Sequence, residues 1–486
     1  MGIVIRQSFF NTFILFLGFA IGGINILFLY TNFLHEDYFG LIIFLLSTGN
    51  LLLPLIVFGM QHTIVKFFST YKTKLEQDGF LTSAIFLPLL VIIPLAGIGS
   101  IAYTSISEWL SEENQLIKNY TYLIFFIALF MGYFELFYAW TKVHLKTVFG
   151  SFIKEIFARI SVSVLLILVY LEQLSQEQFI YAVVVVYGIR TLIMAVFAFR
   201  VYKPNFIFGL PENIKEIVSF SFYMIVAGSA GGILLEIDKV MIPQMEQIAQ
   251  VAYYSVGIYI ASVVGIPNRA MQQITSPITA RDINENNFKE VSSLYKQTSI
   301  NLLVIGGLLF LIINLNVSDL YILINKPEFS RGYWIVLIVS IAKLIELALG
   351  TGNAILVNSK YYKMFFYLSI SMAITVVVLN RWLIELFKIN GAALATLIVV
   401  FVFSAIKILY IKKRFKIIPF GLRTIKILAI IGGLYAAFRF WNFTFHPIIN
   451  IGLKSGIIIV LYLVLVKWMN VSREIDKVIV KYLNRE

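Results

Sequence analysis

The stretch Ser219–Gln244, SFSFYMIVAGSAGGILLEIDKVMIPQ, decides the fold that the sequence predicts. It is an apolar segment with closely spaced glycines that runs directly into Glu236, Asp238 and Lys239, as expected of a helix that crosses a membrane and ends near its surface. A second stretch, 8–32, carries a related order of small residues, GFAIGGI at 18–24 against GSAGGI at 228–233. We interpret the two stretches as the first helices of two related halves.

The composition predicts a membrane protein. Of the 486 residues, 59% are hydrophobic and 13% are charged, whereas soluble proteins carry about a quarter of charged residues. Apolar runs of about 20 residues recur along the chain, and each is long enough to cross a hydrocarbon core of about 30 Å. The runs are continuously apolar and not alternating, which favours helices over a β-barrel. We therefore predict an all-α polytopic membrane protein.

Several classes of site and partner are excluded at this stage. The chain has no cysteine, which rules out disulfides, thiolate metal sites and cysteine nucleophiles. The four histidines are scattered near predicted helix ends, so no metal site is expected. The net charge of +13 could suggest nucleic acid, but the cations lie at the ends of apolar runs, where membrane topology explains them. We expect no nucleic-acid partner and an uncleaved first span.

We predict about fourteen transmembrane helices, six in each half and two more at the C-terminus. An even number of spans returns the chain to its starting side, so the halves are expected to be parallel repeats about an axis normal to the membrane. The predicted division is an N-lobe at 1–205, a C-lobe at 206–416, two extra helices at 417–470 and a tail at 471–486. The predicted spans are 8–32, 38–60, 80–104, 117–141, 147–171, 178–201, 214–236, 246–266, 295–317, 332–356, 362–384, 390–411, 423–441 and 447–469.

Lys and Arg predict the orientation of these spans. About 27 of the 39 flank the even joints and the termini, which places both termini in the cytoplasm. The tail 471–486 has apolar residues at three- and four-residue spacing and is expected to lie as an interfacial helix. The longest joint, 268–294, is expected to form only a short surface helix. Prolines inside or beside spans are expected to bend them, at Pro54, Pro88, Pro94 and Pro267.

Ionisable residues inside the spans are the candidate functional residues, because such groups are costly in a membrane and usually face a partner or a cavity. Arg190 is the first candidate for an anion contact, and its alternative is a structural salt bridge to Glu135. Arg159 either binds substrate or extends toward the headgroups. Lys343 and Glu346 are three residues apart, so they either pair with each other or contact substrate.

Three carboxylates are candidates for coupling to H⁺ or Na⁺: Glu135, Glu346 and Asp238. Glu135 could equally be the buried partner of an arginine. Asp238 and Lys239 are expected at the outer interface, paired with solvent or with each other. The glycine steps 18/22 and 228/232 have the small-xxx-small form that permits close helix approach and suits a contact between lobes.

Scattered elements of the sequence resemble bacterial polysaccharide transporters. They are Gly59-Met60 with 65–71 (VKFFSTY), 237–242 (IDKVMI), Gly257-Ile258-Tyr259, Pro277 with 294–296, and 390–396 (NGAALAT). Together they look like the O-antigen type oligosaccharide flippases of the multidrug, oligosaccharidyl-lipid and polysaccharide (MOP) exporter superfamily.

This resemblance implies two six-helix lobes that move an undecaprenyl-pyrophosphate-linked oligosaccharide across the bacterial inner membrane, in lipopolysaccharide or related glycan synthesis. It also implies a cationic cavity. Here the matching cations are Arg159, Arg190 and Lys343, with Lys66 and Arg269 near the cytoplasmic mouth. Expected partners are the lipid-linked oligosaccharide, membrane lipids and glycan polymerase or assembly proteins, and no cofactor is expected beyond a coupling ion.

Three alternatives stay open. Two extra C-terminal helices are more like the lipid II flippase, in which they form a groove for the lipid tail. A multidrug extrusion antiporter would share the fold, and Glu135 is its lone candidate carboxylate. A membrane glycan polymerase or ligase is disfavoured because it would usually carry a large outer loop. No Walker A, Gly-x-Ser-x-Gly, His-Glu-x-x-His or Asp-x-Asp element occurs, so we expect no enzyme and no catalytic residue.

Overall fold

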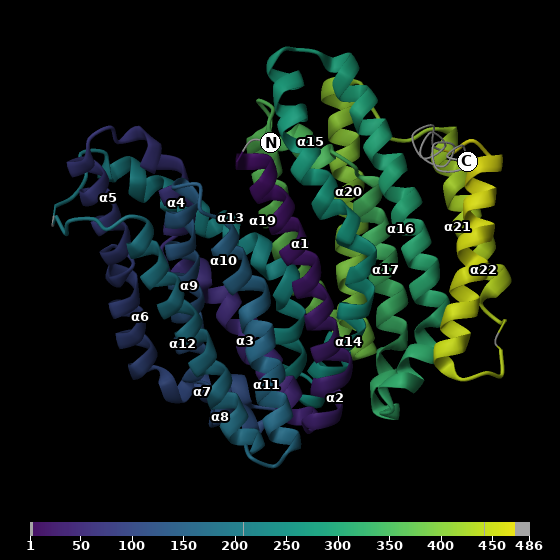
Figure 1. The fold of residues 1–486 in the computed structure, drawn as a ribbon, viewed down its shortest axis with the longest axis horizontal. Helices are drawn as coiled ribbons and strands as arrows, with labels where there is room; N and C mark the ends of the chain where they lie inside the picture. Colours follow the sequence, from purple (N-terminus) through teal and green to yellow (C-terminus); the bar gives the residue numbers. More distant parts are fainter. Residues whose placement is uncertain (1–2, 208, 442, 472–486) are drawn as a thin grey trace. The chain divides into compact units, whose positions relative to one another are not determined.

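The computed structural model describes residues 3–207, 209–441 and 443–471, and its regular structure there is helical throughout (Figure 1). The predicted interfacial helix of the tail lies outside these residues. The helices of the first part of the chain are α1 (Ile3–Ile24), η1 (Asn25–Leu29), α2 (Tyr30–Phe33), α3 (Glu36–Ile56), α4 (Met60–Phe67), η2 (Phe68–Thr70), α5 (Lys74–Phe86), α6 (Leu89–Ile101), α7 (Tyr103–Ser111), α8 (Gln115–Lys118), α9 (Leu123–Val143), α10 (Val148–Phe152), η3 (Ile153–Phe157), α11 (Ala158–Tyr170), α12 (Gln176–Val201), α13 (Ile214–Met241), η4 (Ile242–Gln244) and α14 (Ala249–Ser262).

The remaining helices follow without a long loop. They are η5 (Val263–Gly265), α15 (Ile266–Asn284), α16 (Phe288–Ile324), η6 (Pro327–Gly332), α17 (Tyr333–Ala348), α18 (Gly352–Val357), α19 (Tyr362–Phe387), α20 (Ile389–Phe415), α21 (Leu422–Phe438) and α22 (Pro447–Trp468). Within the described ranges, 11 helical stretches are long and apolar enough to cross a membrane. Each predicted span overlaps a helix, but α10–α11, α17 and α21 fall outside those 11 stretches. The chain is a multi-pass membrane protein, and the count of fourteen spans stays a prediction.

The chain packs as two compact units, which divide between Ser255 and Val256. In the N-terminal unit α3 packs on α9 and α13, and α9 packs on α12 and α4. In the C-terminal unit the 37-residue α16 packs on α17 and α22, and α20 packs on α17 and α19. Helix α13 therefore packs with the N-terminal unit, although we place the start of the second repeat at 206. That repeat boundary concerns internal sequence similarity and stays a prediction.

The glycine prediction holds at one of two positions. A Cβ on Gly18 would lie 2.7 Å from the Glu155 carbonyl oxygen, so α1 approaches η3 as closely as only glycine allows. At Gly228 the nearest neighbour of such a Cβ is Pro54 at 3.5 Å, an ordinary van der Waals contact. The close approach at Gly18 lies inside the N-terminal unit, where it brings α1 against a polar segment.

The joint predicted at 268–294 is wrong in length. Residues Ile266–Asn284 form the helix α15, and α16 begins at Phe288, so only three residues connect the two helices. Pro267 explains the start, because proline at the first helical positions is favoured and lacks only an N–H that would have no helical partner. Pro54 and Pro94 lie inside α3 and α6, and Pro88 separates α5 from α6.

The predicted span 332–356 is also interrupted. Between α17 and α18 the chain turns at Gly350, whose φ is +50°, and a Cβ there would lie 2.8 Å from the Ser299 amide nitrogen. Glycine is the residue that adopts this backbone conformation without strain. The break is held by polar contacts, since the Gln272 side chain donates to the Gly350 carbonyl at 3.1 Å and Ser299 donates to the Ala348 carbonyl at 2.7 Å.

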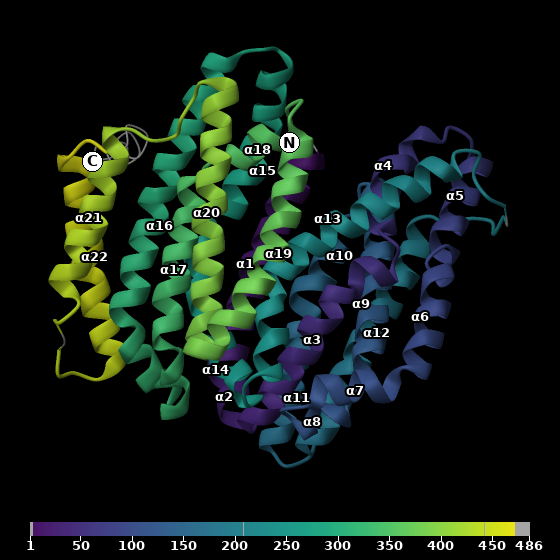
Figure 2. The same ribbon diagram turned by 180° about the vertical axis from the view of Figure 1, so that it is seen from behind.

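The last two helices lie side by side along α16 at the edge of the C-terminal unit (Figures 1 and 2). Polar contacts fix α22 on α16. The buried Lys454 donates to the Leu315 carbonyl at 2.9 Å, and Asn316 donates to Ser455 at 3.1 Å. Farther along, Asn450 donates to Asp319 at 3.2 Å. These contacts join α22 to the C-terminal unit by polar groups as well as by apolar packing.

Candidate functional site

Two π-helical turns introduce polar groups into the interior of the N-terminal unit. The first, η1, begins at Asn25, whose side chain donates to the Arg159 carbonyl at 2.9 Å and accepts from the Ser163 hydroxyl at 2.6 Å. The second, η3, carries Lys154 and Glu155. Single π-helical turns are rare and occur often at functional sites. Here they lie where α1, α11 and η3 meet.

Glu135 of α9 forms an ion pair with Lys154 of η3, at 2.6 Å between Oε1 and Nζ. This corrects the structural alternative in which Glu135 pairs with Arg190. The Glu135 side chain is 16% exposed and that of Lys154 is 40% exposed. Sequence reasoning missed Lys154, although it lies inside the predicted span 147–171. Glu135 is therefore the buried partner of a lysine and not of an arginine as predicted, and its other predicted role, ion coupling, stays a prediction.

We expect Lys154→Ala to destabilise the protein, because it leaves the Glu135 carboxylate without its cation. Breaking a fully buried pair costs about 3–5 kcal/mol, and the partial exposure of Lys154 reduces the expected cost to about 2 kcal/mol. The double variant Glu135→Gln/Lys154→Ala removes both charges and is expected to recover most of that loss. Thermal unfolding of the purified variants checks this, and a double variant no more stable than Lys154→Ala would contradict it.

Arg159 is held by its own helix. Its Nη1 donates to the Glu155 carboxylate at 2.6 Å and to the Glu155 carbonyl at 2.5 Å. The guanidinium lies against Gly18, since a Cβ on that glycine would be 2.7 Å from Nη1. The structure places the Arg159 guanidinium against α1 and Glu155, and the Glu155 carboxylate balances its charge.

Arg190 of α12 is a buried cation of the N-terminal unit that no acid balances by direct contact. Only 7% of the residue is exposed, and its guanidinium carbon stacks 3.9 Å from the ring centre of Phe134 and 5.2 Å from that of Tyr187. Its Nε has no hydrogen-bond partner, and no ion pair within 4.0 Å joins Arg190 to any residue that the structure describes. The predicted salt bridge to Glu135 does not form. A buried guanidinium held by aromatic faces keeps its planar donors available for an anion.

Lys66 of α4 also lies in the N-terminal unit. Its ammonium stacks 3.7 Å from the ring centre of Phe220 on α13 and 5.0 Å from that of Phe67. The residue is exposed, as expected of a cation near the end of a span. This contact joins α4 to α13 by a cation–π interaction.

Asp238 is buried within the N-terminal unit, and its place at the outer membrane interface stays a prediction. It is 6% exposed and accepts a hydrogen bond from the Tyr254 hydroxyl. Lys239 pairs instead with Glu236 at 2.7 Å, and Glu236 also accepts from Ser47 at 2.8 Å. The acids at the end of α13 therefore tie that helix to α3 and α14.

In the C-terminal unit Lys343 and Glu346 pair with each other at 2.9 Å, which confirms the self-paired alternative. Arg269 is exposed on α15. Sequence reasoning missed Lys407 of α20, which is buried, donates to Asn353 at 3.1 Å and lies 5.2 Å from the ring centre of Phe365. The sequence contained a signal for this residue, because Lys407 lies inside the apolar run, five residues before the basic cluster 412–414.

Residues 7–266, more than half of the chain, match the family described as polysaccharide biosynthesis protein. The chain belongs to this family. No curated protein matches it in sequence. The resemblance to polysaccharide transporters is thereby confirmed at the level of the family.

Solved structures with the same fold come from the MOP superfamily. This polysaccharide biosynthesis protein superimposes on the lipid II flippase MurJ in an inward closed conformation with a TM-score of 0.71 at 14% identity, over 94% of this chain and 98% of the other. A multidrug resistance MATE family transporter in an inward-facing conformation gives a TM-score of 0.55 at 13% identity, over 84% and 94%. The fold is that of MOP exporters, as predicted.

The predicted cations divide between the two units of the chain. Of the predicted cations, Arg159 and Arg190 lie on the neighbouring helices α11 and α12, whereas Lys343 and Arg269 belong to the C-terminal unit. Arg159 and Lys343 are balanced by acids, and Arg190 is not. Neither unit arranges these groups as an acid–base pair beside a nucleophile. The arrangement suits reversible binding of an anion.

Proposed function

We propose that the protein is a flippase that moves an undecaprenyl-pyrophosphate-linked oligosaccharide from the cytoplasmic to the outer leaflet. The observation that carries this proposal is Arg190, a buried guanidinium stacked on Phe134 with no acid in direct contact. A charge inside a membrane protein is costly, and such groups mark substrate pathways. Membership of the polysaccharide biosynthesis family and the MOP exporter fold support the same conclusion.

The pyrophosphate is the group that Arg190 would bind. A guanidinium presents a fork of N–H donors that matches two phosphate oxygens, and such charge-assisted bonds are about twice as strong as neutral ones. Lys154 and Arg159 lie on the neighbouring segments η3 and α11, each paired with a carboxylate. These pairs limit the net positive charge, so that the pyrophosphate can leave after it has bound.

The remaining parts of the proposal concern the orientation of the chain, the coupling ion and the partners. The protein lies in the bacterial inner membrane with both termini in the cytoplasm. Its two lobes rock against each other, which opens the substrate site to one side of the membrane at a time. An H⁺ or Na⁺ gradient drives transport through one of the carboxylates Glu135, Glu346 and Asp238. Glycan polymerase or assembly proteins receive the product.

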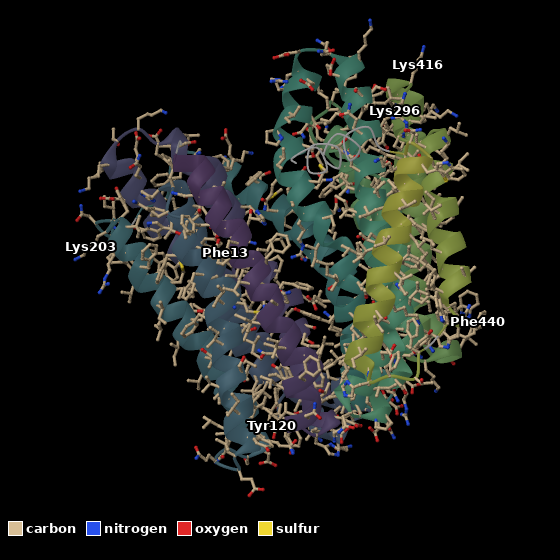
Figure 3. All side chains as sticks on the ribbon, turned by 45° about the vertical axis from the view of Figure 1, so that its right-hand side comes forward. Phe13, Tyr120, Lys203, Lys296, Lys416 and Phe440 are labelled. Carbon is tan, nitrogen blue, oxygen red and sulfur yellow. The ribbon has the colours of Figure 1, made fainter. Side chains whose placement is uncertain are left out.

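The two ends of the N-terminal unit are marked by Lys203 and Tyr120, which lie far apart in Figure 3.

A leaflet assay tests the proposed function. The full chain is reconstituted in liposomes with labelled undecaprenyl-pyrophosphate oligosaccharide, and the label that becomes accessible on the opposite side is followed with time. We expect protein-dependent translocation that increases when an ion gradient of one direction is imposed. An absence of translocation under H⁺ and Na⁺ gradients of either direction would overturn the proposal.

One alternative substrate has an observation in its favour. The two C-terminal helices, which resemble those of the lipid II flippase, pack on α16, and Lys454 and Asn450 of α22 form polar contacts with it. The superposition also covers 98% of the MurJ chain. The same liposomes are therefore tested with labelled lipid II.

A further inference from the structure

A groove runs along α5 of the N-terminal unit. It consists of two adjoining cavities of about 410 Å³ and about 250 Å³, which share Ile207, Gly209 and Leu210. One wall is the helix pair α5–α6, and the other is formed by the described parts of the connecting segment that leads to α13, residues 202–207 and 209–213. Lys203, in this segment, lies at one end of the N-terminal unit (Figure 3).

Hydrogen bonds hold the connecting segment along α5. Asp78, which is 1% exposed, accepts from the Tyr202 hydroxyl at 2.6 Å and from Asn205 at 3.1 Å. Tyr71 donates to Asn213 at 2.6 Å, and Ser83 donates to the Gly209 carbonyl at 3.1 Å. Burial and the neighbouring Asp78 raise the pKa of Tyr202 to about 12, so its hydroxyl remains a donor throughout the physiological range. These bonds join the described residues of the connecting segment to α5 and to Tyr71 before it.

The groove changes from polar to apolar along its length. The larger cavity is lined by Glu76 and Glu212 as its charged groups, together with Thr70, Tyr71 and Asn213. The smaller cavity is lined by Phe86, Leu87 and Leu90 beyond Thr82 and Ser83. Residues Lys74–Ile101 form a stretch long and apolar enough to cross a membrane. The polar cavity therefore opens near a membrane surface, and the apolar cavity follows the hydrocarbon.

Charge is distributed unevenly around the polar cavity. Its lining carries carboxylates, whereas Lys72, Lys74 and Lys215 are exposed next to lining residues in the chain. A ligand that fits has a cationic group toward Glu76 and Glu212, an anionic group toward the lysines and an apolar chain. Glu76 accepts from the Thr73 amide through one oxygen, at 3.1 Å, and so is held in place.

We propose that this groove binds one amine-bearing phospholipid of the surrounding bilayer, of the phosphatidylethanolamine type. The ammonium lies against Glu76 and Glu212, the phosphate faces the lysines, and one acyl chain follows Phe86 and Leu90. Primary ammonium groups donate three hydrogen bonds, which a choline headgroup lacks, and the carboxylates disfavour phosphatidylglycerol. The lipid would hold the connecting segment on α5 and is independent of the proposed flippase activity.

Native mass spectrometry of the full chain tests this proposal, with an equimolar mixture of phosphatidylethanolamine, phosphatidylglycerol and phosphatidylcholine of identical acyl chains. We expect one retained phosphatidylethanolamine. Glu212→Gln is expected to weaken its retention about tenfold, the loss of one charge-assisted hydrogen bond. Leu210→Trp, which fills the groove, is expected to remove it. The control for Glu212→Gln is Glu328→Gln, at an exposed acid outside the groove. The control for Leu210→Trp is Leu422→Trp, because Leu210 is 70% exposed and Leu422 is 71% exposed.

Every other outcome overturns the proposal. Equal retention of the three lipids would show that the carboxylates select no headgroup. Preference for phosphatidylglycerol would assign the site to the lysines alone. If Leu210→Trp and the control Leu422→Trp lower lipid retention equally, the lipid binds elsewhere. Because Leu210 and Glu212 are exposed, their variants are expected to fold, and unchanged thermal unfolding without lipid verifies this.

Discussion

Arg190→Ala is expected to abolish translocation of the lipid-linked oligosaccharide in liposomes, while the amount of folded protein stays the same. The guanidinium is buried and stacked on Phe134, and it has no acid in direct contact whose charge the substitution would leave unbalanced. Two charge-assisted hydrogen bonds to the pyrophosphate would be lost, which lowers substrate affinity by at least about 100-fold. In cells, surface glycan is expected to disappear.

Two further variants separate the anion contact from a general effect of charge. Arg190→Lys keeps the charge but loses the planar fork, so only partial recovery is expected. Arg200→Ala removes an exposed arginine from the last turn of the same helix and is expected to translocate normally. Normal translocation by Arg190→Ala would remove Arg190 from the site, and the flippase proposal would then need another anion contact.

The second large effect is expected at Gly391, where α19 turns into α20. A Cβ at this position would lie 1.9 Å from the Leu383 carbonyl oxygen and 2.8 Å from the Ile384 amide nitrogen. Both neighbours are backbone, so they yield only if the helix end moves. We expect Gly391→Ala to destabilise the protein by about 3 kcal/mol, at the upper end of the usual overpacking cost.

A matched control has the opposite expected sign. Gly456 lies inside α22, and a Cβ there would meet nothing within 4 Å. Gly456→Ala is therefore expected to stabilise the helix by about 0.5–1 kcal/mol, the ordinary gain for alanine over glycine. Thermal unfolding of both variants is the measurement. If Gly391→Ala unfolds at the temperature of the unchanged protein, the tight turn between α19 and α20 is not needed for stability.

Hydropathy was sufficient to predict the helical membrane fold, because each span must satisfy its backbone hydrogen bonds within itself. The same independence of each span explains what was missed. Whether Glu135 pairs with Arg190 or Lys154 depends on how α9, η3 and α12 pack, and no single span encodes that. The Lys343–Glu346 pair was predictable because both residues lie on one helix face.

The joints were harder to predict than the spans. Polarity at 268–294 favoured a loop with a short helix, but α15 is a full helix whose polar residues reflect its position and not a lack of helix propensity. The turn at Gly350 was hidden in an apolar run, because the backbone conformation of one glycine interrupts a span without changing its hydropathy.

The π-helical turns η1 and η3 have a consequence for comparing this chain with its relatives. Each turn closes hydrogen bonds to the fifth residue instead of the fourth, so it takes up one residue more than an α-helical turn of the same height. A helical wheel drawn through either span is therefore offset by one position beyond the turn. An alignment with a relative whose helix is regular needs a single-residue gap there, and without it the residues after Phe157 are assigned to the wrong face.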